Sequence, residues 1–510
     1  MYGDLIDALP TVLTVANFAA IVIGVIAGIV VGALPGLSAT MAISVLVPFT
    51  FGLDPLVALG LMAGIYNGAM YGGAIPAILL RIPGTPAAVA TCFDGYPMAQ
   101  QGKGGYALQV AVVSSSIGGI ASALALMLLA PPLSRVTLLF GPSEIFWIAV
   151  FGLSSVVFLL GKHVVKGLIS AAFGVLVSSV GADPILGVDR FTYGQLELLD
   201  GINIVILLVG LYALPPVIDL LEKPLKTDAL GTGKLHTQSL LTSLPSMFRF
   251  WRTWLRSSLF GIWIGILPGA GGSMAAFLSY NEARRASKTP ETWGKGEPEG
   301  IAASETANNA DTAAALIPAL TLGIPGTAVA AVMLGGLLIH GLQPGPMLFR
   351  ENPDVVFGFM WQFLFGAILL IFLGGSLATN NFARVLALPR PLLGAMIIVL
   401  MLVGVYSIHG RMFDVYLMLG FGAIGYLMDK LDFPLPPVVL GLILGGFAEE
   451  NLRLALRIGQ GDWSILWHNV TSQLLIVLTI GVVFGPGILR RIRRKGGKGG
   501  GGDADGNATP

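Results

Sequence analysis

The chain has 510 residues, of which 55% are hydrophobic and 11% carry a charge, and its mean hydropathy is +0.81. Average proteins carry about 25% charged residues, so this composition excludes an ordinary soluble protein and predicts an all-α polytopic membrane protein with the lipid bilayer as its solvent. The net charge of +1 argues against a nucleic-acid partner. The single cysteine, Cys92, excludes a disulfide within the chain and a cysteine-based metal site.

Apolar runs of near spanning length recur along the whole chain. The first follows a start without lysine or arginine, whereas a secretory signal peptide needs a basic start, so the run is predicted to be a true span. At about 20 residues per span, the sequence predicts about 12 or more transmembrane helices, some of them broken or re-entrant. The clearest runs are 12–33, 107–130, 145–160, 204–221, 356–377, 392–408 and 474–489.

Two pairs of segments resemble each other in the same order. The segment 66–85, "YNGAMYGGAIPAILLRIPGT", aligns without a gap with 308–327, "NNADTAAALIPALTLGIPGT". Upstream, "GALPGLSAT" at 32–40 aligns with "GILPGAGGS" at 265–273. Each half therefore carries an LPG break followed by an IPGT break, and the sequence predicts an internal duplication.

Charge predicts how the two halves are oriented. The first copy follows Asp4 and Asp7 without a base, and the second follows Arg249, Arg252 and Arg256. Because basic residues prefer the cytoplasmic side, the halves are predicted to be inverted-topology repeats, with the N-terminus outside and the C-terminus cytoplasmic. The predicted units are a first half at 1–221, a cytoplasmic linker at 222–256, a second half at 257–490 and a basic, Gly-rich, disordered cytoplasmic tail at 491–510.

The breaks have a chemical use. In hydrocarbon, the backbone groups that a proline frees must be satisfied inside protein or beside a water-filled cavity. Freed carbonyls suit a small cation, and N–H groups at the start of the next half-helix suit an anion. The predicted substrate-binding residues are Pro35, Gly36, Ser38, Thr40, Gly269, Gly271, Gly272 and Ser273. The predicted cation-binding residues are Asn67, Gly84, Thr85, Asn308, Asn309, Gly326 and Thr327. The alternative, that the breaks and asparagines only pack, stays open.

The second half adds two acidic residues in "ASETANNADTAAALIP" at 303–318. One helical face carries Glu305, Asn308, Asn309 and Thr312, and Asp311 lies at its edge. Ionisable residues inside a span are functional candidates by default, so Glu305 and Asp311 are candidates for coupling or proton transfer. The alternative is that both lie near the cytoplasmic surface.

Other charged residues are expected to have structural roles. Arg81, before the first IPGT break, either binds a carboxylate or reaches to the membrane interface. The segment 445–456, "GGFAEENLRLAL", is interpreted as a loop or a subunit contact, and Asp94 as a solvated residue. The sequence has no phosphate-binding Walker motif, HExxH or GxSxG, so it predicts neither an ATPase nor any other enzyme.

Long motifs spread over about residues 17–461 resemble the large membrane subunit of tripartite tricarboxylate transporters, the TctA type. They are the stretches around both LPG and both IPGT breaks and the late "GFAEENLRLAL". The resemblance implies a bacterial inner-membrane, multi-pass secondary transporter, and the charge pattern above places its N-terminus on the periplasmic side. It implies a small membrane subunit (TctB type) and a periplasmic solute-binding protein (TctC type) as partners.

The predicted function is the permease subunit of a cation-coupled importer of citrate or related carboxylates, which the binding protein delivers. Na⁺ is the expected coupling ion, and no cofactor and no metal other than transported Na⁺ are expected. A proton-coupled carrier that uses Glu305 or Asp311 remains the nearer alternative, and a channel the more distant one.

Overall fold

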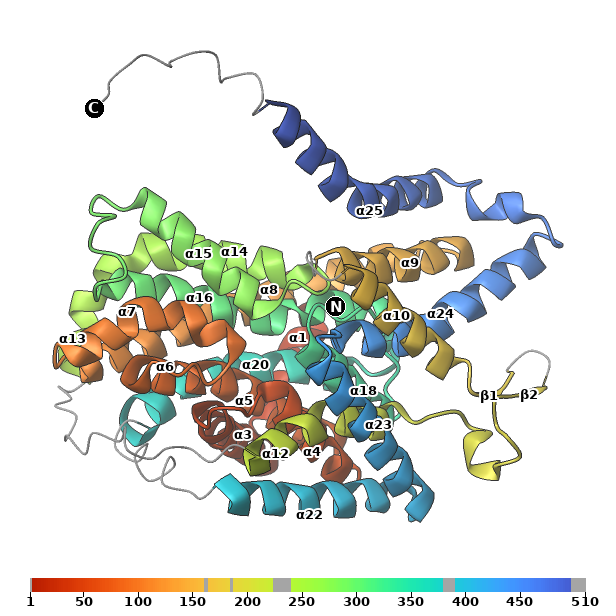
Figure 1. Ribbon diagram of the computed structural model, residues 1–510, viewed down its shortest axis with the longest axis horizontal. Coiled ribbons are helices and arrows are strands. Elements are labelled where there is room, and N and C mark those ends of the chain that lie inside the picture. The colour runs from red at the N-terminus through yellow and green to blue at the C-terminus, as the bar shows by residue number, and fades with distance from the viewer. Residues whose placement is uncertain (1, 160–163, 184–186, 223–239, 379–389, 497–510) are drawn as a thin grey trace, which may run out of the picture.

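The structure is a computed structural model that describes residues 2–159, 164–183, 187–222, 240–378 and 390–496 (Figure 1). Its elements are helices and one two-stranded antiparallel ribbon, in which Gly181 pairs with Arg190. The prediction of an all-α fold is therefore confirmed at the level of class.

The first half begins with short helices and contains both breaks and one very long helix. Its helices up to the second break are α1 (Tyr2–Asp7), α2 (Leu9–Val12), α3 (Val15–Ala33), α4 (Ala39–Thr50), α5 (Pro55–Gly72), α6 (Ala74–Leu80), the 3-10 turn η1 (Pro86–Ala88), α7 (Val89–Gln100) and α8 (Gly104–Thr137). There follow α9 (Pro142–Leu159), α10 (Val164–Ser178), β1 (Gly181–Ala182), β2 (Asp189–Arg190), η3 (Leu196–Leu198), α11 (Ile204–Leu208), the π-helical η4 (Val209–Ala213) and α12 (Leu214–Glu222).

The second half repeats the sequence of broken helices and ends in longer ones. Its elements through the second break are α13 (Leu240–Met247), η6 (Phe248–Phe250), α14 (Trp251–Ile266), α15 (Gly271–Ala286), α16 (Pro298–Ala314), α17 (Leu316–Leu322) and α18 (Ala328–Ile339). The remainder are α19 (Leu348–Glu351), α20 (Pro353–Phe372), the π-helical η7 (Leu373–Ala378), α22 (Arg390–His409), α23 (Met412–Lys430), α24 (Pro436–Ile458), η8 (Trp463–Leu466) and α25 (Val470–Gly496).

Two predicted boundary regions are described only in part. Of the predicted linker, residues 240–256 form α13, η6 and the start of α14, and residues 223–239 lie outside the described residues. Of the predicted tail, α25 includes residues 491–496, and the rest lies outside the described residues. The division of the chain into units stays a prediction.

Six helices in the described part of the chain are long and apolar enough to cross a membrane. They are Val15–Ala33, Gly104–Thr137, Ile204–Glu222, Pro353–Gly375, Pro391–His409 and Met412–Lys430. Shorter apolar helices, such as Ala39–Thr50 and Ala328–Ile339, follow the breaks. The expected total of about 12 or more spans stays a prediction, and so does the inverted orientation of the halves.

Small residues bring the helices of the first half into close contact. A Cβ on Gly28 of α3 would collide with the backbone carbonyl oxygen of Ile65 on α5, and a Cβ on Gly68 of α5 would collide with that of Val25 on α3. Such backbone approach is typical of helix pairs in membranes, where apolar side chains gain little by leaving lipid. The pair α3 and α5 is thus held in register beside both first-half breaks.

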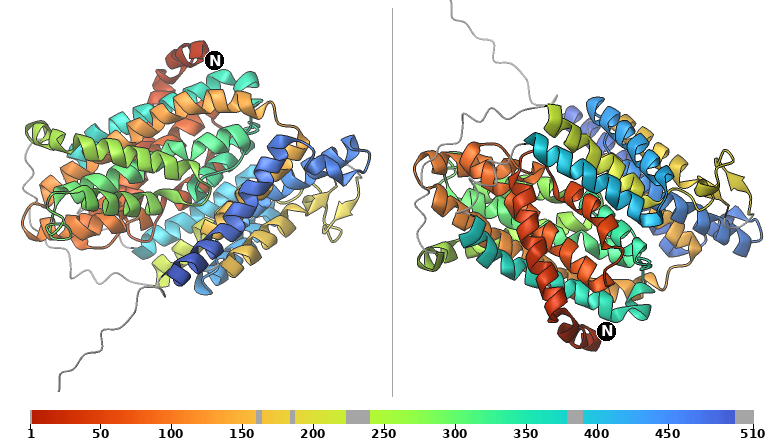
Figure 2. Two further views of the ribbon diagram at one scale, coloured as in Figure 1. Left: turned by 90° about the horizontal axis from the view of Figure 1, so that it is seen from above. Right: turned by 90° about the horizontal axis from the view of Figure 1, so that it is seen from below.

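Two groups of helices stand out, and η4, α12, α22 and α23 pack against one another and against α4 beside them. Helices α3 to α8, α14 to α16 and α20 pack as one bundle, and α9, α10, α24 and α25 form a second group beside it (Figures 1 and 2). The β1–β2 ribbon projects from the outer edge of the second group (Figure 1). Both IPGT breaks lie among the helices of the first group and its neighbour α18.

Candidate ion and substrate site

The LPG motif ends a helix in the same way in both halves. Leu34 follows α3 and Leu267 follows α14, and each leucine N–H donates to the carbonyl oxygen three residues earlier, at 3.1 and 3.0 Å. The following glycines, Gly36 and Gly269, have φ of 96° and 82°, a conformation that a residue with a Cβ rarely adopts. The motif therefore stops one helix and redirects the chain into α4 or α15.

The IPGT motif also has one backbone conformation in both halves. Arg81 and Gly323 end the preceding helix with φ of 59° and 72°. The N–H groups of Gly84 and Gly326 then donate back across the break, to Gly73 and Ala315 oxygens, at 3.1 and 3.2 Å. Some of the backbone groups that the proline leaves without helical partners are thus hydrogen-bonded within the break. The break therefore has a defined backbone structure of its own and is more than a kink in a helix.

Arg81, directly before the first IPGT break, lies at the surface. The side chain is exposed, and its guanidinium carbon lies 5.8 Å from the centre of the Tyr96 ring. This placement favours the interpretation of Arg81 as a surface residue over a carboxylate ligand.

In each half the IPGT break lies against the helix that ends in the LPG break. A Cβ on Gly84 would collide with the carbonyl oxygen of Gly32, and a Cβ on Gly326 would collide with that of Gly265. In the second half a hydrogen bond joins the two breaks directly, because Gly269 N–H donates to Gly326 O at 2.8 Å. Only glycine permits this approach.

Polar side chains from both halves meet at the second-half breaks. Asn308 of α16 donates from Nδ2 to the carbonyl oxygen of Met70 on α5, at 3.2 Å. Tyr66 of α5 places its hydroxyl 3.2 Å from Thr327 Oγ1 in the IPGT motif. A Cβ on Gly272 would lie 2.8 Å from Asn308 Oδ1, so the first turn of α15 borders the same place. The structure thus brings Gly272, Asn308 and Thr327 together.

Several buried oxygens here and nearby accept no hydrogen bond from the described residues. They are Oδ1 of Asn67, Asn308 and Asn309, Oγ1 of Thr85, and both carboxylate oxygens of Asp311. Buried acceptors are nearly always partnered in folded proteins, and oxygen atoms are the ligands that hard cations such as Na⁺ use at broken helices. These atoms belong largely to the set that the sequence predicted for a cation.

The predicted cation residues do not all gather at one point. Asn67 lies where α5 meets α8 and α20, with its Nδ2 3.4 Å from Phe363 O. Thr85 lies against Gly73 in the first-half break, where a Cβ would be 2.5 Å from Thr85 Oγ1. Asn309 donates to its own helix, at Glu305 O. The cation residues at the second-half breaks are therefore Asn308, Gly326 and Thr327.

The predicted substrate residues are divided in the same way. In the second half, a Cβ on Gly271 would lie 3.9 Å from Thr327 Cγ2, and Gly272 and Ser273 continue the first turn of α15. In the first half, Ser38 Oγ caps α4 by accepting from Met41 N–H at 3.2 Å. The other predicted residues of this motif are Pro35, Gly36 and Thr40. Gly36 is exposed, and a Cβ on it would lie 4.0 Å from Leu220 of α12; Thr40 is half-buried.

Glu305 is fully buried and held by hydroxyl groups. Thr91 Oγ1 of α7 donates to Oε1 at 2.5 Å, and Ser115 Oγ of α8 donates to Oε2 at 3.0 Å. Asp311, six residues later on the same helix, is also fully buried. Both carboxylates therefore lie inside the protein and not at its surface. The sequence missed Thr91, Ser115 and Tyr66, because nothing local marks them as partners of α16.

Asp94 is not solvated, as the sequence had suggested, but completely buried. Its Oδ1 accepts the N–H groups of Gly294, Gly296 and Glu297 at 2.8, 2.9 and 2.8 Å, and its Oδ2 accepts the Tyr280 hydroxyl at 2.7 Å. The polar segment between α15 and α16 folds back over α7 and removes Asp94 from water. The expectation was wrong because this contact joins residues far apart in the chain.

The segment 445–456 is also different from expectation, since it is part of helix α24 and not a loop. Arg453 forms ion pairs with Asp183 and with Glu449, both at 2.6 Å, and Arg190 pairs with Glu449 at 2.6 Å. These contacts tie α24 to the β1–β2 ribbon. The structure does not test a subunit contact here.

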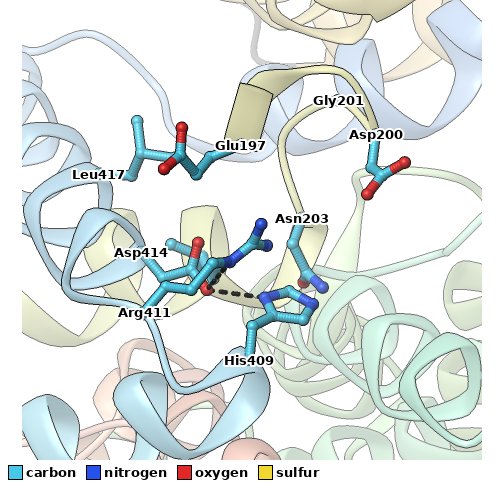
Figure 3. Close-up of a pocket in the computed structure, with 9 residues that line it drawn as sticks. Glu197, Asp200, Gly201, Asn203, His409, Arg411, Asp414 and Leu417 are labelled. Atoms are coloured by element: carbon cyan, nitrogen blue, oxygen red, sulfur yellow. Dashed lines mark hydrogen bonds and ion pairs between the residues drawn. The ribbon is translucent and has the colours of Figure 1, made fainter. Parts of the chain in front are cut away.

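A separate polar pocket of about 390 Å³ lies between the 197–203 loop and the junction of α22 and α23 (Figure 3). His409 Nδ1 lies 2.7 Å from Asp414 Oδ2, and Arg411 Nε lies 3.7 Å from the same oxygen. Figure 3 shows Glu197 and Asp200 on the loop across from this group. None of the predicted site residues lines this pocket.

Broken helices that gather buried amides, hydroxyls and a carboxylate are typical of helical membrane transporters. The comparison with known families makes this specific: the chain belongs to the tripartite tricarboxylate transporter TctA family, which matches residues 18–440. This confirms the resemblance seen in the sequence. The family is one of transporters and not of enzymes, and its tripartite systems imply two further components.

Two relatives come from Agrobacterium vitis. One, described as an uncharacterized 52.8 kDa protein in the TAR-I ttuC' 3' region, is 36% identical over 473 residues, which is 93% of this chain and 93% of the relative. The other, an uncharacterized protein in the TAR-II ttuC' 3' region, is 35% identical over 218 residues, which is 43% of this chain and 90% of the relative. No solved structure matches the chain.

Proposed function

We propose that this chain is the permease subunit of a Na⁺-coupled secondary importer of tricarboxylates or related carboxylates. In this proposal it lies in the bacterial inner membrane, works with a TctB-type membrane subunit, and receives its substrate from a TctC-type periplasmic binding protein. Family membership supports the substrate class and the tripartite arrangement.

The observation that carries the proposed coupling is the set of buried oxygens without hydrogen-bond donors at and around the breaks. Amide and hydroxyl oxygens without donors attract a cation that has lost its water. Asn308 supplies such an oxygen at the second-half breaks, and Asn67 and Thr85 supply them in the first half. Na⁺ bound among them offsets the charge of a carboxylate substrate.

The substrate carboxylate binds, in this proposal, at the start of α15. The N–H groups of Gly271, Gly272 and Ser273 are the first in a helix of 16 residues, and such groups with the helix dipole favour an anion. One group of helices then moves against the other to expose the site to each side in turn.

The experiment is uptake of radiolabelled di- and tricarboxylates by proteoliposomes that contain this chain, its small membrane subunit and the binding protein. We expect concentrative uptake that requires both an inward Na⁺ gradient and the binding protein. Uptake that does not saturate with substrate concentration and only runs down the substrate gradient would indicate a channel and contradict the proposal.

A proton-coupled carrier is the second candidate, because Glu305 and Asp311 are carboxylates buried among helices. An inward pH gradient without Na⁺ distinguishes the two. Concentrative uptake driven by that gradient alone would replace Na⁺ by H⁺ as the coupling ion.

A further inference from the structure

The two halves differ at one chemically decisive position. In the gapless alignment of the IPGT segments, Ala69 stands where Asp311 stands. A Cβ on Gly32 would collide with the carbonyl oxygen of Ala69, whereas a Cβ on the matching Gly265 would lie 3.0 Å from Asp311 Oδ1. Both glycines thus lie against the backbone carbonyl of the matching residue, and that residue carries a methyl group in the first half and a carboxylate in the second.

Asp311 has no oppositely charged partner among the described residues. The side chain is 0% exposed, and neither carboxylate oxygen accepts a hydrogen bond from the described residues. None of the ion pairs among those residues includes Asp311. A buried carboxylate is stable as the ion only when a cation pairs with it, and otherwise it takes up a proton and becomes neutral.

Glu305 does not share this property, although it lies on the same helix and is equally buried. Two hydroxyl groups, on Thr91 and Ser115, donate to its two oxygens and connect α16 to α7 and α8. Its environment is that of a residue that positions helices. The two carboxylates of α16 therefore have separate roles.

The surroundings of Asp311 include a second free oxygen and a helix start. Asn308, three residues earlier on α16, has an Oδ1 that accepts no hydrogen bond from the described residues and lies beside Gly272. The backbone N–H of Gly272 also lies near the Asp311 carboxylate. The anion-binding end of α15 is thus already faced by a negative charge of the chain itself.

We propose that Asp311 is the anionic ligand of the coupling Na⁺, with Asn308 Oδ1 as a second ligand, and that the ion must bind before the carboxylate substrate. The inference rests on the proposed function. Without the ion, Asp311 repels a substrate carboxylate from the start of α15. With Na⁺ on Asp311, that repulsion is removed and the N–H groups of the first turn of α15 are available to the substrate. The first half has Ala69 at the matching position, and so has no carboxylate there.

The test is Na⁺-dependent thermal stabilisation of the purified full-length chain in detergent, titrated with NaCl against choline chloride at constant ionic strength. Wild type should gain Tm with Na⁺. D311N should lose the gain, with an apparent Na⁺ affinity about tenfold or more weaker. In the absence of Na⁺, D311N should have a higher Tm than wild type, because the substitution removes an uncompensated buried charge.

Glu305→Gln is the matched control, since it also neutralises a buried carboxylate of α16 and should keep the Na⁺ response. If D311N cannot be purified, Asn308→Ala should still weaken Na⁺ binding, by about tenfold. Unchanged Na⁺ affinity in D311N, or in Asn308→Ala where D311N is lost, would overturn the assignment of Asp311.

The order of binding is tested with whichever carboxylate the uptake assay identifies. Wild type should bind it only with Na⁺, and D311N should bind it equally with and without Na⁺. A wild-type chain that takes up the carboxylate without any need for Na⁺ would instead overturn the proposed coupling ion, and with it this inference. If only the D311N predictions fail, and wild-type uptake still requires Na⁺, the proposed function stands.

Discussion

At the scale of single residues, hydrogen bonding separates groups that look alike in the sequence. Asn67 and Asn309 align, yet Asn67 contacts α20 across the bundle and Asn309 bonds only to its own helix among the described residues. Tyr66, which the sequence did not single out, contacts Thr327 of the other half. A pattern shows that a helix face is polar, but the neighbouring helices decide which atoms keep a free lone pair.

The first prediction concerns the proposed cation ligands at the second-half break. Thr327→Ala should lower Na⁺-dependent uptake about tenfold, because it removes one polar ligand of the ion; a tenfold loss corresponds to about 1.4 kcal/mol. The readout is uptake rate against Na⁺ concentration in proteoliposomes. Thr321→Ala is the control, since its buried hydroxyl only donates to Ile317 O at 2.7 Å. Equal Na⁺ dependence in Thr327→Ala and wild type would remove Thr327 from the site.

The second prediction concerns Glu305 as a residue that positions helices. Glu305→Gln should lower the free energy of unfolding by about 1–3 kcal/mol. The substitution replaces one carboxylate oxygen by an NH₂ group, which cannot accept the hydrogen bond that the Thr91 or Ser115 hydroxyl donates. Thr91→Val and Ser115→Ala should each destabilise the protein by a smaller amount. Thermal unfolding in detergent measures all three. A Glu305→Gln protein as stable as wild type would contradict this role.

At the scale of elements, two devices hold the broken helices in place. Glycines let α3 and α5 pack backbone to backbone, and the loop between α15 and α16 closes over Asp94 of α7. The first joins helices within one half, and the second joins the two halves. Both lie beside breaks, so both support the geometry of the candidate site.

The glycine contact predicts a matched pair of substitutions. Gly68→Ala should destabilise the fold by about 1–3 kcal/mol, because its Cβ meets backbone of α3 that cannot move aside. Gly420→Ala, on an exposed face of α23 with nothing within 4 Å, should be neutral or stabilise by up to about 1 kcal/mol. Unfolding titrations in mixed detergent micelles compare the two. Equal effects would show that the close approach does not matter for stability.

The hydrogen bonds between Asp94 and the loop that joins α15 to α16 predict a change in protease sensitivity. Asp94→Ala leaves three backbone N–H groups of the loop without their acceptor, which should cost about 3 kcal/mol or more locally. Trypsin should then cut faster at Arg284, Arg285 or Lys288. Glu291→Ala, an exposed change in the same loop, should leave the cleavage rate unchanged. A rate in Asp94→Ala equal to that of wild type would show that other contacts hold the loop.

At the scale of the whole molecule, charges at helix ends indicate a direction across the membrane. Glu222, at the end of α12, accepts a hydrogen bond from Tyr426 and pairs with Lys430 at 3.7 Å, so α12 and α23 end together. The predicted linker starts at this end, and the basic end of α25 is predicted to lie on the same, cytoplasmic side. The turn before α25 should then lie outside.

This orientation is tested by cysteine labelling. In a Cys92→Ser background, His468→Cys before α25 and Asp429→Cys at the end of α23 are both at exposed positions. An impermeant maleimide should label His468→Cys in intact cells and Asp429→Cys only after permeabilisation. The reverse pattern would invert the proposed topology.

Much of the fold followed from the sequence because membrane proteins obey strong local rules. Long apolar runs must be helical in lipid, and proline with glycine must interrupt them. The positions of α3, α8, α20 and both pairs of breaks agree with these rules. The placement of Asp94 and of segment 445–456 did not follow, since hydrogen bonds and ion pairs to distant residues decide it.

The sequence by itself determined that the chain is a helical membrane protein of the TctA type, where its helices break, and which polar residues accompany the breaks. Only the tertiary structure decided that Glu305 is held by hydroxyl groups while Asp311 and Asn308 keep free oxygens at the start of α15. The physical reason is that lipid selects the composition of each helix locally, whereas a hydrogen-bond partner is supplied by whichever helix packs alongside.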